Sequence, residues 1–139
     1  MPPIRENIHI LALDIGAKRV GVAVARADVR MPSPLVTLTL DDTFLDKLNV
    51  LIAELNVQTI VSGLPRGLDS QDTDQTVVVK ELAKAIEEQT GLEIVFQDEA
   101  LTSVKAKEEL SARGKIYSKP DVDKLAACYI LEDYIKDNF

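Results

Sequence analysis

The stretch from His9 to Ala25, with the sequence HILALDIGAKRVGVAVA, constrains the fold more than any other part of the chain. Its two apolar runs, Ile10 to Ile15 and Val20 to Ala25, have the length and composition of buried strands. Gly16 opens the short connection between them, and glycine adopts the backbone angles that tight turns need. We predict a β-hairpin whose first strand carries one carboxylate, Asp14. Because an unpaired buried charge is costly, Asp14 needs a partner.

The composition favours a protein with one ordinary core. The chain has 139 residues, 46% of them hydrophobic, which predicts a single domain over residues 1–139. No apolar run reaches the roughly 18 residues of a membrane span, and the start lacks the pattern of a signal peptide. Cys128 is the only cysteine, so an internal disulfide is excluded, and no Cys/His cluster suggests zinc. We expect a cytoplasmic protein that does not associate with membranes.

The formal net charge of −7 argues against nucleic-acid binding through overall charge. It is compatible with a local basic strip beside an acidic, metal-binding centre. Basic residues gather late in the chain, where solvated helix faces are the simpler interpretation. They are Lys105, Lys107, Arg113, Lys115, Lys119 and Lys124.

The remaining periodicity predicts an α/β fold. A third strand with alternating apolar residues follows the hairpin closely enough to form an antiparallel meander. Helices and strands then alternate, which implies parallel strands joined by right-handed crossovers. The result is a five-stranded mixed sheet, three strands antiparallel and two parallel, flanked by helices. After the hairpin we expect strands at 35–40, 59–63 and 93–96, and helices at 44–55, 76–89, 103–112 and from about 120.

Local signals refine the helix ends. Thr43 with Asp46, and Ser118 with Asp121, have the spacing of capping boxes. In the second helix, the apolar spacing predicts that Val78 faces inward.

Three carboxylates fall where the chemistry of such a sheet is expected, at the carboxyl ends of its strands. Asp14 lies near the end of the first strand, Glu99 lies just after the fifth, and Asp123 is in the first turns of the last helix. Converging carboxylates repel one another unless cations bind, and Mg²⁺ prefers oxygen ligands. Two such ions can support phosphodiester hydrolysis. The alternatives are a turn former for Asp14 and helix-start acids for the other two.

Several polar residues near these strand ends are candidates for phosphate binding. The Gly-rich segment after the fourth strand carries Arg66, although a plain surface turn is nearly as good an interpretation. Ser62 and Thr102 could touch a phosphate, and Thr102 could equally cap a helix. Tyr117 is a candidate for stacking on a base. The only histidine, His9, is interpreted as a structural residue.

Four ordered blocks resemble the YqgF family, also called RuvX. The blocks are LALDIGAKRVGVAVA, IVSGLPRGLDSQDTDQT, QDEALTS and VDKLAACYILEDYI. Members of that family are ribonuclease H-like proteins assigned as Holliday junction resolvases and linked to maturation of small-subunit ribosomal RNA. The resemblance therefore implies a ribonuclease H-like domain with nuclease activity.

Carried over block by block, the resemblance makes Asp14, Glu99 and Asp123 catalytic ligands of Mg²⁺ or Mn²⁺. The arginine that the family has after Asp-Glu is Ala100 here, and Lys18 or Lys105 could substitute for it. The candidate substrate contacts are Lys18, Arg19, Arg66, Thr102 and Lys105.

The leading hypothesis is a metal-dependent endonuclease acting on RNA or branched DNA, as a Holliday junction resolvase or in processing of the pre-16S ribosomal RNA precursor. Ribosomal precursor particles are a further expected partner, and the protein could be a monomer or a homodimer. One alternative is a non-catalytic, nucleic-acid-binding ribosome-assembly factor of the same fold. Another is an ATP-using fold relative, although those proteins need two such domains and this chain supplies one.

Overall fold

The computed structural model describes residues 8–65, 73–99, 102–114 and 117–139, without the side chains of residues 99 and 102–104. The order of its elements confirms the predicted order β-β-β-α-β-α-β-α-α. These elements are β1 (His9–Ile15), β2 (Arg19–Arg26), β3 (Ser33–Thr39), α1 (Phe44–Glu54), β4 (Val57–Pro65), α2 (Asp74–Thr90), β5 (Ile94–Glu99), α3 (Thr102–Ala112) and α4 (Lys119–Asn138).

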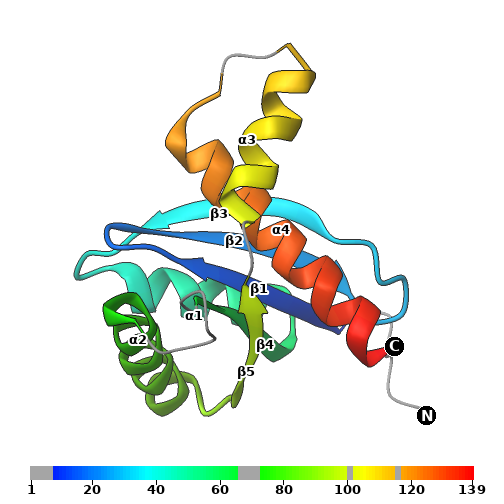
Figure 1. The fold of residues 1–139 in the computed structure, drawn as a ribbon. Coiled ribbons are helices and arrows are strands. Elements are labelled where there is room, and N and C mark those ends of the chain that lie inside the picture. Colours follow the sequence, from blue (N-terminus) through cyan, green and yellow to red (C-terminus); the bar gives the residue numbers. More distant parts are fainter. Residues whose placement is uncertain (1–7, 66–72, 100–101, 115–116) are drawn as a thin grey trace.

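The strands form one sheet in the order β3-β2-β1-β4-β5. The pairs β1–β2 and β2–β3 are antiparallel, whereas β1–β4 and β4–β5 are parallel. The predicted five-stranded mixed sheet is therefore confirmed. Helices α1 and α2 cover one face of the sheet, and α4 crosses the other face with α3 beside its N-terminal part (Figure 1). Among the helices that the structure describes, none has the length and hydropathy of a membrane span.

Alternation along β1 divides its side chains between the two faces. Leu11 and Leu13 belong to the core under α1 and α2. Ile10 and Ala12 belong to the second core, under α3 and α4. Asp14 continues the Ile10–Ala12 series, so its half-buried carboxylate lies on the face that α4 covers.

Helix α2 begins earlier than predicted. Its N-cap is Thr73, before the predicted helix start at residue 76, and Thr73 and Thr76 form a reciprocal capping box. The inward position of Val78 was wrong: its side chain is 43% exposed, and Val79 is fully buried instead. A run of three valines does not specify a helical phase. The phase follows from Thr76, whose buried hydroxyl donates to the carbonyl of Pro65.

The two other predicted capping boxes had different outcomes. The Ser118–Asp121 box at the start of α4 is confirmed, and the hydrogen bond from the Ser118 N–H lowers the pKa of Asp121. The predicted Thr43–Asp46 box was wrong, because Thr43 forms its hydrogen bonds with Asp41 instead. The Thr43 hydroxyl and N–H both donate to Asp41 Oδ1, at 2.6 and 2.8 Å.

Two single-residue interpretations, for His9 and Ser62, and the lone cysteine can be compared with the structure. The ring of His9 bonds through Nδ1 to the carbonyl oxygen of Leu55 at 2.7 Å, which is a structural role. Cys128 is buried in the core, and burial raises the pKa of its thiol to about 11. Ser62 was wrong as a phosphate contact, since it is fully buried and its hydroxyl donates to the Gly63 carbonyl.

Candidate active site

Helix α4 lies very close to the sheet at Gly21 of β2. A Cβ atom added at Gly21 would lie 2.0 Å from the carbonyl oxygen of Asp123 and 2.2 Å from its carbonyl carbon. Only a glycine leaves room for the helix backbone at this position. Residues far apart in the sequence thus meet because one strand residue has no side chain.

This close approach also places Asp14 beside α4. Asp14 and Gly21 are direct partners across the antiparallel β1–β2 pair. The Cβ positions of such partners project from the same face and lie roughly 4.5–5.5 Å apart. Since the Cβ position of Gly21 points at the backbone of Asp123, Asp14 lies next to the helix turn that carries Asp123.

Glu99 ends β5 in register with Pro65, the last residue of β4. Strands β1 and β5 flank β4, so their backbones are two strand spacings apart, roughly 10 Å. The side chain of Glu99 lies outside the described residues, as do Arg66, Ala100 and the side chain of Thr102. The sequence-based assignments for Glu99, Arg66 and Thr102 therefore stay predictions.

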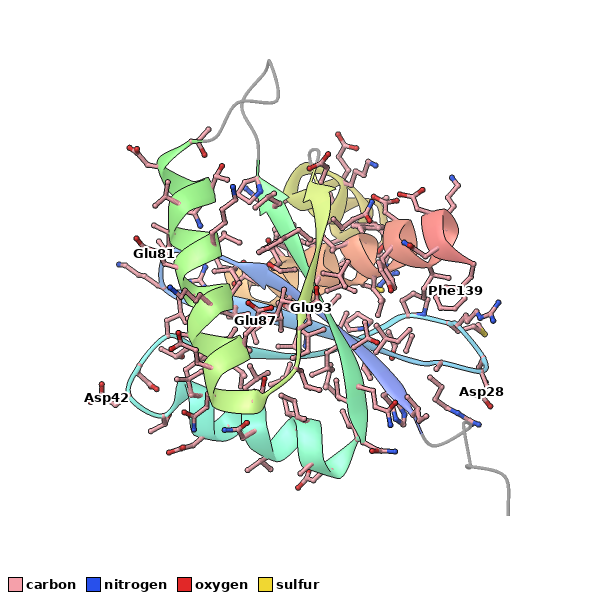
Figure 2. All side chains as sticks on the ribbon, turned by 90° about the horizontal axis from the view of Figure 1, so that it is seen from below. Asp28, Asp42, Glu81, Glu87, Glu93 and Phe139 are labelled. Atoms are coloured by element: carbon pink, nitrogen blue, oxygen red, sulfur yellow. The ribbon has the colours of Figure 1, made fainter. Side chains whose placement is uncertain are left out.

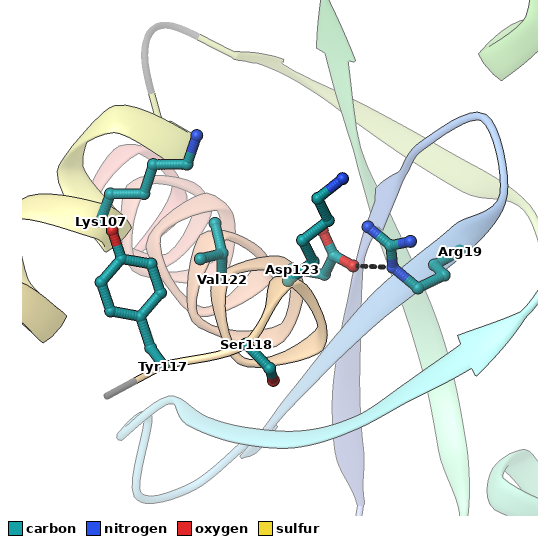
Figure 3. A pocket seen from close by; sticks show the side chains of 7 residues that line it. Arg19, Lys107, Tyr117, Ser118, Val122 and Asp123 are labelled. Carbon is teal, nitrogen blue, oxygen red and sulfur yellow. Dashed lines mark hydrogen bonds and ion pairs between the residues drawn. The ribbon is translucent and has the colours of Figure 1, made fainter. Parts of the chain in front are cut away.

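Asp123 is held by an arginine from the hairpin turn. Arg19 Nε donates to Asp123 Oδ2 at 2.7 Å, and the two side chains are 32% and 22% exposed (Figure 3). Arg19 was expected to contact substrate, yet its guanidinium orients a candidate metal ligand. Within the described part of the chain only its Nε is engaged, so four further N–H donors are available to a phosphate.

The start of α2 fixes the carboxyl ends of β1 and β4. Gln75 Nε2 donates to the carbonyl oxygen of Ile15 at 3.0 Å, and Thr76 donates to that of Pro65. Asp14 precedes Ile15, so the helix holds the strand end that carries the candidate ligand. Sequence reasoning missed this role, although the Thr-x-x-Thr spacing at Thr73 was a signal for it.

A cavity of about 530 Å³ opens beside Asp123. A smaller one of about 270 Å³ adjoins it at the β1–β2 turn, and the two share Arg19, Lys119 and Asp123. Lys18 lines the smaller cavity and Lys107 the larger, whereas Lys105 lines neither. Lys105 lies near the carboxyl group of Glu132 on α4, where burial raises the pKa of Glu132 and the Lys105 charge only partly offsets that rise.

Two of these lysines, Lys107 and Lys119, were interpreted from the sequence as parts of solvated helix faces. The structure brings them to the same cavity as Tyr117 and Asp123. Their nearness in sequence to Tyr117 was the available signal, but the packing of α3 against α4, which brings Lys107 to this cavity, is a tertiary feature.

The donor set suits a hard divalent cation as far as the described side chains extend. Asp14 and Asp123 supply carboxylate oxygens on one face of the sheet, and such oxygens are the ligands that Mg²⁺ and Mn²⁺ prefer. Among the side chains that the structure describes, no three of His, Cys, Asp or Glu gather closely enough to hold a metal. The third ligand that the sequence predicts is Glu99, whose side chain lies outside this set.

The fold is that of the RuvC-like resolvases, which are ribonuclease H-like proteins. RuvC from Thermus thermophilus, solved in complex with a Holliday junction substrate, superposes with a TM-score of 0.59 at 12% identity, over 94% of this chain and 96% of that one. The fowlpox virus resolvase, solved with Holliday junction DNA, superposes with a TM-score of 0.51 at 12% identity, over 93% and 97% of the two chains.

The chain belongs to the RuvX family, whose model, described as Holliday junction resolvase, matches residues 8–137. A relative from Shewanella denitrificans, named "Putative pre-16S rRNA nuclease", is 34% identical over 96% of this chain and 97% of its own length. A relative of the same name from Sulfurihydrogenibium sp. is 35% identical over 91% of this chain and 89% of its own length. The family predicted from the four sequence blocks is confirmed.

Proposed function

We propose that this protein is a Mg²⁺- or Mn²⁺-dependent endonuclease that hydrolyses phosphodiester bonds in structured nucleic acid. The observation that carries the proposal is the approach of α4 to Gly21, which sets Asp123 next to Asp14 at the carboxyl end of β1. The proposed substrates are a four-way DNA junction and the precursor of 16S ribosomal RNA, because the family and its relatives bear those names. Ribosomal precursor particles are a proposed partner, and the cytoplasm the proposed setting.

The candidate residues would have three roles: binding cations, orienting a ligand and binding phosphates. Asp14, Asp123 and Glu99 would hold the divalent cations, which when bound supply the positive charge that stabilises the attacking and leaving oxygens of the phosphodiester. Arg19 fixes the orientation of Asp123 through its Nε–Oδ2 hydrogen bond. Lys18 and Lys119, on the rim of the adjoining cavity, would bind the phosphates beside the scissile bond.

The test is cleavage of a substrate panel by wild type and Asp14→Asn in Mg²⁺ and in Mn²⁺. The panel contains a four-way junction, a pre-16S fragment and a short RNA. We expect Asp14→Asn to lower the cleavage rate by more than about 100-fold, since losing a residue that merely supports a metal ligand already costs 10–100-fold. The matched control is Asp42→Asn, an exposed carboxylate near the start of α1. If wild type cleaved none of the three substrates with either metal, the proposal would be contradicted.

A second function has one observation in its favour. The contact of Arg19 with Asp123 neutralises a candidate ligand without any metal, as a non-catalytic nucleic-acid-binding factor would permit. Under that function, Asp14→Asn would bind nucleic acid and support growth as well as wild type does. The same pair of proteins therefore separates the two functions.

A further inference from the structure

The cavity beside Asp123 continues away from the candidate active site. A third cavity, of about 370 Å³, lies between β3, α3 and α4, and Tyr117 lines both it and the 530 Å³ cavity. Arg19 and Asp123 in turn connect the 530 Å³ cavity to the one at the hairpin turn. Shared lining residues thus connect the three cavities in series, here called the groove, and Tyr117 lies between the two larger ones.

The groove is basic, although the whole chain has a net charge of −7. Lys18 and Lys119 line its first part, Lys107 its middle, and Arg113 and Lys124 its far part. Arg113 and Lys124 are partly compensated, by Glu109 at 3.1 Å and Asp121 at 3.7 Å. For the other three lysines, no described carboxylate lies within ion-pair distance. A chain of cations on an acidic protein fits a polyanion that follows the groove.

Tyr117 adds a feature that phosphate binding alone does not need. Its ring is 37% exposed and lies opposite Val122, with its hydroxyl end toward Lys107 (Figure 3). An exposed aromatic ring between cations is the arrangement on which unpaired bases stack. Bases within a duplex already stack on one another and present only their edges and phosphates to a groove of this kind.

We propose that this groove binds a single-stranded arm of the nucleic acid, with one unpaired base stacked on Tyr117 and its neighbouring phosphates held by Lys107 and Lys119. The proposal deepens the proposed function, on which it rests for the position of the cleaved bond at Asp123. It names the substrate class as a structured nucleic acid with an unpaired strand leading away from the cleavage site.

The experiment measures binding without added divalent metal, so that no cleavage occurs. Fluorescence anisotropy compares a 12-nucleotide single strand, carrying 2-aminopurine, with a blunt duplex of the same sequence. Tyr117→Ala should weaken single-strand binding about tenfold, the typical loss for one stacked base, and change duplex binding less than about twofold. Tyr117→Phe keeps the ring and should match wild type. Quenching of 2-aminopurine fluorescence should persist in Tyr117→Phe and disappear in Tyr117→Ala.

Substitution of a lysine in the groove should change a different quantity, the salt dependence of binding. Lys107→Ala should weaken binding to both ligands and reduce the slope of log affinity against log salt by about one. Lys84→Ala, on the exposed side of α2, is the matched control and should behave as wild type. Thermal midpoints of all variants verify that each one is folded.

Two results would overturn the inference: equal single-strand affinity of wild type and Tyr117→Ala, or an equal loss on the duplex. The second result would leave a groove that binds phosphates only. Neither depends on cleavage, so a failure of the Asp14→Asn test is distinguishable from a failure here.

Discussion

The two faces of the sheet are packed with side chains of different size. Under α1 and α2 the core is built of large branched residues, among them Leu11, Leu13 and Val22, which meet Leu48 and Ile86. Under α4 the strands present mostly small residues. These are Ala12, Gly21, Ala23 and Ala25, and the three alanines share a core with Ala127 and Cys128 of the helix.

The difference in side-chain size indicates what each face contributes to stability and to the candidate site. Large side chains bury more apolar area, so the α1–α2 face supplies more of the stability. Small side chains let α4 lie close to β1 and β2, and that closeness brings Asp123 to Asp14. Acidic side chains such as Asp42, Glu81 and Glu93 lie on the side of the molecule that carries α1 and α2 (Figure 2). The face with the small residues carries the cavities lined by Lys107, Lys119 and Lys124, although α4 also bears acidic side chains such as Glu132 and Asp133.

The largest effect on stability should come from the face with the large side chains. Leu48→Ala removes a fully buried side chain and should lower the free energy of unfolding by about 2–5 kcal/mol. Cleavage per folded molecule should be unchanged, because Leu48 lies on the side of the sheet away from Asp14. Urea unfolding and an active-site titration measure the two quantities. A loss of specific activity in Leu48→Ala would contradict the assignment of stability to one face and of the candidate site to the other.

Gly21→Ala should affect both stability and activity. The added Cβ would overlap the backbone of Asp123, so α4 must shift, at a cost of about 3 kcal/mol. Metal binding, measured by calorimetry with Mn²⁺, should fall with cleavage because Asp123 moves away from Asp14.

Gly91→Ala is the matched control for that substitution. Gly91 has a φ of 74°, and an added Cβ would meet nothing within 4 Å. The left-handed backbone makes an alanine there cost about 1–2 kcal/mol, without loss of Mn²⁺ binding. If Gly91→Ala lost Mn²⁺ binding as fully as Gly21→Ala, the close approach at Gly21 would not be the reason.

Thr76→Val should have a smaller effect on stability. It removes the hydroxyl that closes the α2 capping box and bonds to Pro65, for about 1–2 kcal/mol. Because the end of β4 loses its anchor, cleavage should fall as well. Thr90→Val removes a hydroxyl that bonds only within the last turns of α2 and the residues after it, and should leave cleavage unchanged.

The smallest effect concerns pH. Burial first, and then the charges of Asp133 and Glu109, raise the pKa of Glu132 above its ordinary value of 4.5. The folded state therefore favours the protonated acid. The resulting stability is complete below about pH 4.5 and is lost as the pH rises through the folded pKa.

Glu132→Gln should accordingly be more stable than wild type at pH 7 and equally stable near pH 4. Urea midpoints at the two pH values test this. Glu88→Gln, exposed on α2, is the matched control. A Glu132→Gln protein less stable than wild type at pH 7 would contradict the expectation.

Much of the fold follows from local patterns. The hairpin, the order of the elements, the mixed sheet and the position of Asp14 at a strand end could all be predicted, because strand alternation and turn residues act over a few neighbours. The phase of α2 could not, since three successive valines fit several phases and the contact from Thr76 to Pro65 decides among them.

The sequence by itself determined the number and order of the strands, the position of Asp14 near the end of β1, and the family to which the chain belongs. Only the tertiary structure decided how close α4 lies to Gly21, that Arg19 contacts Asp123 across 104 residues, and that Lys107 and Lys119 share a cavity with Tyr117. The physical reason is that periodicity specifies the face on which a side chain lies. The distance between two elements depends on the volumes of all the side chains packed between them.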